Sequence, residues 1–125
     1  MASGLGTTGS DGFESCGTQD ELDAFASVIE WLHGDRIAYS NPDRQDKVKA
    51  SWSNKRVGMI GVSYGGTIPF GLATKGVKGL ETIIPIAGIA SWYEYTNAQG
   101  MDRNKDSYKY LLAGYCTSRS LDKED

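Results

Sequence analysis

The chain has 125 residues, of which 39% are hydrophobic and 23% are charged, and its formal net charge at pH 7 is −3. This is the composition of an ordinary globular chain, and the length allows one domain at most. A nucleic-acid partner is disfavoured because phosphate binding needs a clustered positive field. The longest apolar run, around Ile83 to Ala90, is too short to cross a bilayer, and the first residues lack the pattern of a signal peptide. We therefore expect a cytoplasmic chain without a membrane partner.

Two features of the sequence argue against a metal or an organic cofactor. Cys16 and Cys116 stand far apart and neither belongs to a C-x-x-C pair, so metal-ligand spacing is absent. We interpret both as free thiols, with a disulfide as the alternative if the chain is secreted. The stretch Gly4 to Gly9 matches the dinucleotide fingerprint G-x-G-x-x-G in form, but no strand precedes it as that motif requires. We expect this segment to be a loop.

A helix is predicted from about Gln19 to His33. It opens at Thr18 with the T-x-x-E form of a capping box, whose fourth residue is Glu21. Apolar residues then recur at helical spacing, namely Leu22, Phe25, Ala26, Ile29 and Leu32. Gly34 suits the carboxyl end of this helix.

A polar connection is predicted from Ile37 to Lys55. Asn41-Pro42-Asp43 is a turn signal, and Val48 to Trp52 is expected to be briefly extended.

The residues from Arg56 to Gly66 predict a buried strand that runs into a glycine-flanked serine and then into a helix ending near Lys75. Gly61, Ser63 and Gly65 give the G-x-S-x-G pattern of a nucleophile elbow, in which small flanking residues avoid clashes with a strained serine. Such a turn exposes the Ser63 hydroxyl and places the Tyr64 backbone N–H at a helix N-terminus, where it can stabilise an oxyanion. The alternative is a glycine-rich turn whose serine only caps the helix.

A second buried strand is predicted from Leu80 to Ala87, with Pro85 near its end or at a sheet edge. Because parallel strands bring their carboxyl ends to one edge, the residues that follow should lie close to Ser63. Trp92 and Tyr95 in that segment are either a core-capping cluster or the wall of an apolar pocket, and the pattern does not decide between the two. A last helix is predicted from about Asp106 to Thr117.

Several separate motifs, in this order, resemble those of the X-prolyl dipeptidyl aminopeptidases, and the resemblance covers nearly the whole chain. They are Gly9-Ser10-Asp11-Gly12, Val28-Ile29-Glu30-Trp31-Leu32, Lys49-Ala50-Ser51-Trp52, Gly61 to Gly65, and Ala87-Gly88-Ile89-Ala90-Ser91-Trp92-Tyr93. The family consists of α/β-hydrolase serine peptidases that release Xaa-Pro dipeptides from peptide N-termini. The resemblance implies an α/β fold in which residues 1–125 are the central, incomplete portion of an α/β-hydrolase catalytic domain. Its partner would be a peptide with proline at the second position, with no cofactor.

The resemblance also implies roles for individual residues. Ser63 would be the nucleophile, Tyr64 would give one oxyanion-hole N–H, and Trp92 and Tyr95 would line the proline pocket. The aspartate and histidine of the family's triad would follow the last residue, and a second oxyanion donor would precede Met1. Asp106 is a guess for the acid that holds the substrate amine.

His33, the only histidine in the chain, is rejected as the base for Ser63 because α/β-hydrolases place that histidine after the nucleophile. An ester hydrolase of the same fold and a non-catalytic α/β fragment are the alternatives to the peptidase.

Overall fold

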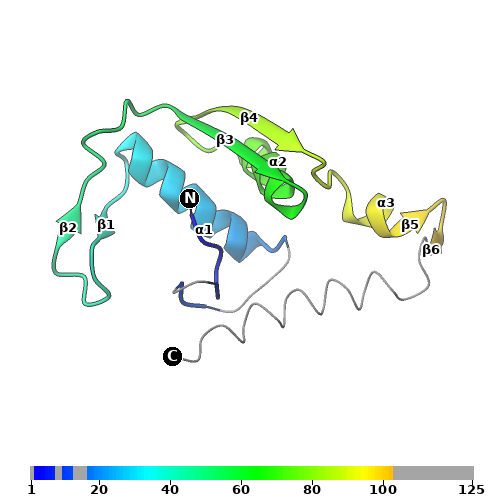
Figure 1. Cartoon of the computed structure of the whole chain (residues 1–125), viewed down its shortest axis with the longest axis horizontal. Coiled ribbons are helices and arrows are strands. Elements are labelled where there is room, and N and C mark those ends of the chain that lie inside the picture. The colour runs from blue at the N-terminus through cyan, green and yellow to red at the C-terminus, as the bar shows by residue number, and fades with distance from the viewer. Residues whose placement is uncertain (1, 8–9, 13–16, 103–125) are drawn as a thin grey trace.

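Two parallel strands, which are paired with each other and connected along the chain by a helix, form the centre of the fold (Figure 1). β3 (Val57–Val62), α2 (Tyr64–Lys75) and β4 (Leu80–Ile86) follow one another along the chain. β3 pairs with β4 in parallel, from Val57 opposite Leu80 to Val62 opposite Ile86. The computed structural model describes residues 2–7, 10–12 and 17–102. Within this part the predicted α/β arrangement, the two strands and the helix between them are confirmed.

α1 (Gln19–His33) has the predicted bounds. Gly34 ends it with a left-handed φ of 100°, and its backbone N–H bonds to the carbonyls of Glu30 and Trp31. The predicted capping box is wrong, because the Thr18 side chain makes no capping hydrogen bond. Glu21 instead accepts a hydrogen bond from the N–H of Gly17, at 3.1 Å. The carboxylate therefore ties the preceding loop to the helix rather than closing the helix on itself.

The core lies between α1, α2 and one face of the β3–β4 pair. Its buried hydrophobic residues are Ala26, Ile29, Ile68 and Leu72. Leu72 is completely buried, which is worth about 1.5–3 kcal/mol relative to an exposed leucine. Because strand side chains alternate between faces, the other face of the pair carries Ile60, Val62, Ile84 and Ile86, which are 45–69% exposed. The described residues thus leave one apolar face of the sheet open.

A short hairpin follows α1 and was not predicted in this form. β1 (Ala38–Tyr39) pairs antiparallel with β2 (Lys47–Val48), across a turn at the predicted position. The extended segment is Lys47–Val48, so the expectation of an extended stretch up to Trp52 is wrong. The Trp31 indole N–H donates to the Val48 carbonyl at 2.9 Å and anchors the hairpin to α1.

The chain beyond β4 forms a short helix and a second small hairpin (Figure 1). α3 (Trp92–Thr96) carries the aromatic cluster, and the Ser91 hydroxyl caps it by accepting from the Glu94 N–H at 3.3 Å. β5 (Asn97–Ala98) pairs with β6 (Met101–Asp102). The predicted last helix from Asp106 to Thr117, Cys16 and Cys116 lie outside the described residues.

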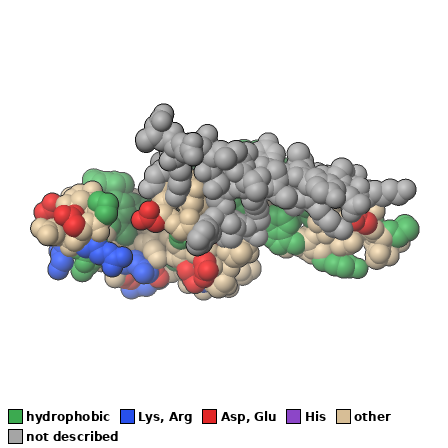
Figure 2. Space-filling model, turned by 90° about the horizontal axis from the view of Figure 1, so that it is seen from below, with side chains coloured by type: hydrophobic (Ala, Val, Ile, Leu, Met, Phe, Trp, Pro, Cys, Tyr) green, Lys and Arg blue, Asp and Glu red, His purple; other side chains and the backbone are tan. Residues whose placement is uncertain are grey.

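The surface carries charges of both signs. In Figure 2 basic side chains gather at the end of the molecule where Figure 1 has β1 and β2, and acidic side chains lie at several separate places. Within the described ranges, no helix is long and apolar enough to cross a membrane. Among those same residues, no group of three or more His, Cys, Asp or Glu side chains could hold a metal ion.

Candidate active site

Ser63 occupies the turn between β3 and α2 with strained backbone angles. Its φ of 56° and ψ of −122° are unfavourable for a residue with a Cβ, and such strain persists only where surrounding contacts enforce it. The Ser63 N–H donates to the Ile86 carbonyl at 2.8 Å, and the Ser63 carbonyl accepts from the N–H groups of Gly66 and Thr67 at 2.9 and 3.1 Å. Both sides of the residue are held, while the side chain stays exposed. This strand–serine–helix geometry is the one that the sequence predicted.

Two glycines make room for the turn, but they are not the pair expected. A Cβ on Gly61 would lie 2.1 Å from the Gly65 carbonyl oxygen, and one on Gly66 would lie 2.8 Å from the Ile86 oxygen. A Cβ on Gly65 would meet nothing within 4 Å. The steric reason predicted for Gly65 is therefore wrong, and Gly66 takes its place because α2 begins directly against the end of β4.

We expect Gly65→Ala to be tolerated in the complete protein and Gly66→Ala to be destabilising. At residue 65, alanine should stabilise the helix by up to about 1 kcal/mol relative to glycine. At residue 66, a Cβ must displace two backbone segments, at a cost of about 1–3 kcal/mol or more. Thermal unfolding of both variants measures the difference. Equal losses of melting temperature at the two positions would contradict this account of the elbow.

Tyr64 starts α2, and its ring contacts Trp92, which in turn contacts Tyr95. The Trp92 ring lies 6.3 Å from the Tyr64 ring between centroids, at an interplanar angle of 45°. Trp92 in turn meets Tyr95 edge-on, at 6.2 Å. Trp92 and Tyr95 are both half-buried. The structure thus places the aromatic pair beside the elbow, as the carboxyl-end rule led us to expect.

Thr67 connects the elbow to the segment that carries the aromatics. Its side chain is 8% exposed, and its hydroxyl accepts a hydrogen bond from the Ile89 N–H at 2.9 Å. A Cβ on Gly88 would lie 2.6 Å from the Gly66 oxygen, so this segment passes directly over the start of α2. The sequence gives no signal for Thr67, since a threonine in the first turn of a helix is common.

His33 lies at the other end of the sheet from Ser63. Its Nδ1 is 2.7 Å from the Lys55 carbonyl oxygen, and its ring faces Gly79. Lys55 and Gly79 precede β3 and β4, whereas Ser63 follows β3, and a strand of this length spans about 20 Å. The histidine therefore does not reach Ser63, in agreement with the sequence-based rejection.

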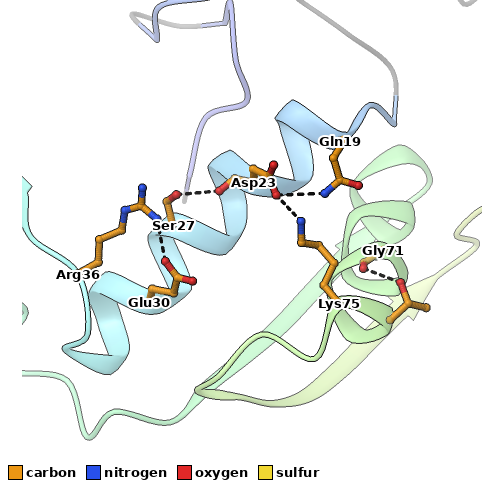
Figure 3. Close-up of polar contacts among 8 residues, drawn as sticks. Gln19, Asp23, Ser27, Glu30, Arg36, Gly71 and Lys75 are labelled. Atoms are coloured by element: carbon orange, nitrogen blue, oxygen red, sulfur yellow. Dashed lines mark hydrogen bonds and ion pairs between the residues drawn. The ribbon is translucent and has the colours of Figure 1, made fainter.

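Polar contacts between α1 and α2 are structural (Figure 3). Asp23 on α1 pairs with Lys75 near the end of α2 and also accepts from Gln19, at 3.1 Å. The hydrogen bond from Lys75, followed by that from Gln19, lowers the pKa of the exposed Asp23 carboxyl. Arg36 and Glu30 form a further pair, at 2.8 Å. Exposed pairs of this kind contribute little stability, and these lie away from the elbow.

A family model described as X-Pro dipeptidyl-peptidase (S15 family) matches residues 1–125. The chain belongs to this S15 family. Similar proteins include the Xaa-Pro dipeptidyl-peptidase of Lactobacillus helveticus (strain DPC 4571), 47% identical over 101 residues, which cover 81% of this chain and 13% of that protein. The same enzyme of Streptococcus gordonii (strain Challis) is 44% identical over 106 residues, 85% of this chain and 14% of that protein. That of Pediococcus pentosaceus (strain ATCC 25745) is 41% identical over 128 residues, 99% of this chain and 16% of that protein.

The chain thus spans only 13–16% of the length of these S15 relatives. Among the described residues, three separate segments meet at one place: the elbow, α3, and the first turn of α1 with Gly17 before it. Gly17, before α1, and Glu21, in its first turn, contact Tyr64, and neither was expected as part of a site. Asp106, the candidate for binding the substrate amine, lies outside the described residues.

Proposed function

We propose that residues 1–125 are the nucleophile-bearing central portion of an α/β-hydrolase catalytic domain that removes Xaa-Pro dipeptides from peptide N-termini. The observation that carries the proposal is the strained, exposed Ser63 at the turn from β3 to α2. Membership in a family described as X-Pro dipeptidyl-peptidases supports the peptide substrate with proline at the second position. An elbow that only capped a helix would have no need of a serine in this backbone conformation.

In the proposed reaction, the Ser63 hydroxyl attacks the carbonyl carbon of the substrate proline, and the peptide bond from this carbon to the next residue breaks. A histidine outside residues 1–125, oriented by an aspartate, takes the hydroxyl proton and passes it to the leaving amine. The Tyr64 backbone N–H stabilises the oxyanion of the tetrahedral intermediate, together with a second donor outside this chain. Water then hydrolyses the ester between Ser63 and the dipeptide, so that the enzyme is regenerated without a metal or an organic cofactor.

Trp92 and Tyr95 are proposed as the wall that receives the proline ring. Their T-shaped contact presents flat apolar surfaces beside the elbow. Such surfaces exclude water around a compact ring and leave no room for a long side chain. The proline preference would then arise from the shape of this wall.

Ala substitution at Trp92 or Tyr95 should selectively impair cleavage after proline in the complete enzyme. Loss of one wall should remove about 1–3 kcal/mol of transition-state binding, or about 10–200-fold in kcat/KM, for Gly-Pro anilide. Cleavage of Gly-Leu anilide and of a simple ester should fall less. Steady-state kinetics with the three substrates measures this selectivity.

Tyr93 offers a matched control, since it lies between the two aromatics and is 63% exposed. Tyr93→Ala should leave the ratio between the three substrates unchanged. If Trp92→Ala lowers turnover of all three substrates equally, or lowers only the melting temperature, the aromatics are core residues. A complete enzyme that cleaves the ester but neither anilide would instead favour an ester hydrolase of the same fold.

A further inference from the structure

The Glu21 carboxylate is a buried acid beside the elbow that the proposed reaction does not use. The residue is 3% exposed and lies in the first turn of α1. Its Oε2 accepts hydrogen bonds from the Tyr64 phenol and from the Gly17 N–H, the latter at 3.1 Å. The Gly17 N–H also lies 2.6 Å from the Tyr64 phenol oxygen. The carboxylate, the phenol and the backbone N–H thus form a closed triangle that joins α1 to α2.

This triangle also touches Trp92. The Tyr64 ring packs against the indole, with 6.3 Å between centroids. On the other side, a Cβ added at Gly17 would lie 2.8 Å from the indole Nε1, so Gly17 lies directly against the edge of the Trp92 ring. Gly17 has a φ of +70°, a conformation that glycine adopts without strain. Gly17, one of the two groups that contact the Tyr64 phenol, therefore also borders the indole proposed as the proline wall.

We propose that Glu21 is a positioning residue for substrate selection, which acts by fixing the Tyr64 phenol and, through it, the orientation of the Trp92 indole. The inference rests on the proposed function, since it assigns Glu21 to the selectivity of that same site. Hydrogen bonds to a carboxylate are roughly twice as strong as those between neutral groups, so Glu21 restrains the phenol more firmly than packing alone. Without the carboxylate the Tyr64 side chain can change rotamer, and the Trp92 indole then loses a packing partner. The wall then no longer favours the compact proline ring over other side chains.

The test measures the ratio of kcat/KM for Gly-Pro and Gly-Ala anilides in the complete enzyme. Glu21→Ala should lower this ratio about tenfold, the lower end of what a modest pocket contact gives. Glu21→Gln keeps an oxygen that can accept from both donors, and it should retain the ratio within about threefold. Asp20→Ala is the matched control, because Asp20 is an exposed acid in the same helical turn and should not change the ratio.

A double-mutant cycle with Tyr64→Phe tests whether Glu21 acts through the phenol. Tyr64→Phe should lower the ratio about as much as Glu21→Ala, and Glu21→Ala should add less than about twofold in the Tyr64→Phe background. Independent, multiplicative losses would overturn the inference. If Glu21→Ala does not fold, Tyr64→Phe with Glu21→Gln decides, since an unchanged ratio in Tyr64→Phe contradicts the proposal.

Two further outcomes separate this inference from the proposed function. If the wild-type enzyme prefers Gly-Pro and Glu21→Ala lowers the melting temperature without changing the ratio, Glu21 is only structural and this inference alone fails. If the wild-type enzyme shows no preference for proline, or a fluorophosphonate does not label Ser63, the proposed function fails and the inference with it.

Discussion

Replacing Ser63 by alanine in the complete enzyme should lower kcat for Gly-Pro anilide about a million-fold. Removal of the nucleophile in a serine peptidase costs about 10⁶ in kcat, or about 8 kcal/mol at 1.4 kcal/mol per tenfold. The loss is expected because the exposed Ser63 hydroxyl is the proposed nucleophile of the elbow. Tyr64, whose N–H is the proposed oxyanion donor, follows it directly as the first residue of α2. Steady-state turnover and thermal unfolding should be measured on the same preparation, because alanine should leave the melting temperature nearly unchanged.

Ser63→Gly adds a control for backbone strain. Glycine adopts positive φ without penalty, and strain of this kind costs about 1–3 kcal/mol, so the variant should be inactive and at least as stable as the wild type. Ser27→Ala, on the surface of α1, should change neither quantity. Full activity in Ser63→Ala would show that another residue carries the reaction. A large loss of stability in Ser63→Gly would show that the serine hydroxyl supports the fold.

Residues 1–125 expressed alone should give no measurable turnover of Gly-Pro anilide. The only histidine of the chain bonds to the Lys55 carbonyl, at the opposite end of β3 from Ser63, so this histidine is not available to take the serine proton. We also expect marginal stability and self-association. In the part of the chain that the structure describes, one face of the sheet is apolar and open at Ile60, Val62, Ile84 and Ile86, whereas parallel sheets are normally covered on both faces.

Turnover assays, thermal melts and sedimentation of this 125-residue chain test the expectation. The double variant Ile60→Lys/Ile84→Lys is the matched control, since it places charge on the open face without touching the core. It should remain monomeric at concentrations where the wild-type chain associates. A cooperative, high-temperature unfolding transition together with robust turnover in the isolated chain would contradict both the expected inactivity and the expected marginal stability.

Elements that are encoded by short-range patterns could be predicted from the sequence. The bounds of α1 follow from its apolar period and from Gly34, and the structure reproduces them. The strand–Ser63–α2 turn and β4 were likewise predicted, because a β-branched run, a glycine-flanked serine and a helical stretch each leave a local signature. The position of Trp92 near the elbow followed from the rule for carboxyl ends of parallel strands.

Contacts between distant segments could not be predicted. Glu21 fits a local capping box, yet its carboxylate bonds to Tyr64, which is 43 positions further along the chain. The packing of α2 against the end of β4, which requires Gly66 rather than Gly65 to be small, depends on how two elements meet in space. Sequence patterns report the period and the ends of an element, whereas these features depend on tertiary packing.

The most direct test of the account is to identify the residue that a fluorophosphonate acylates in the complete enzyme. Trypsin should release residues 57–75 as one peptide, in which Ser63 is the only serine. Mass spectrometry of the labelled and digested enzyme should find the probe on this peptide, at Ser63, with loss of activity in proportion to labelling. Stoichiometric labelling of a serine outside residues 57–75, with loss of activity, would contradict the assignment of Ser63 as the nucleophile.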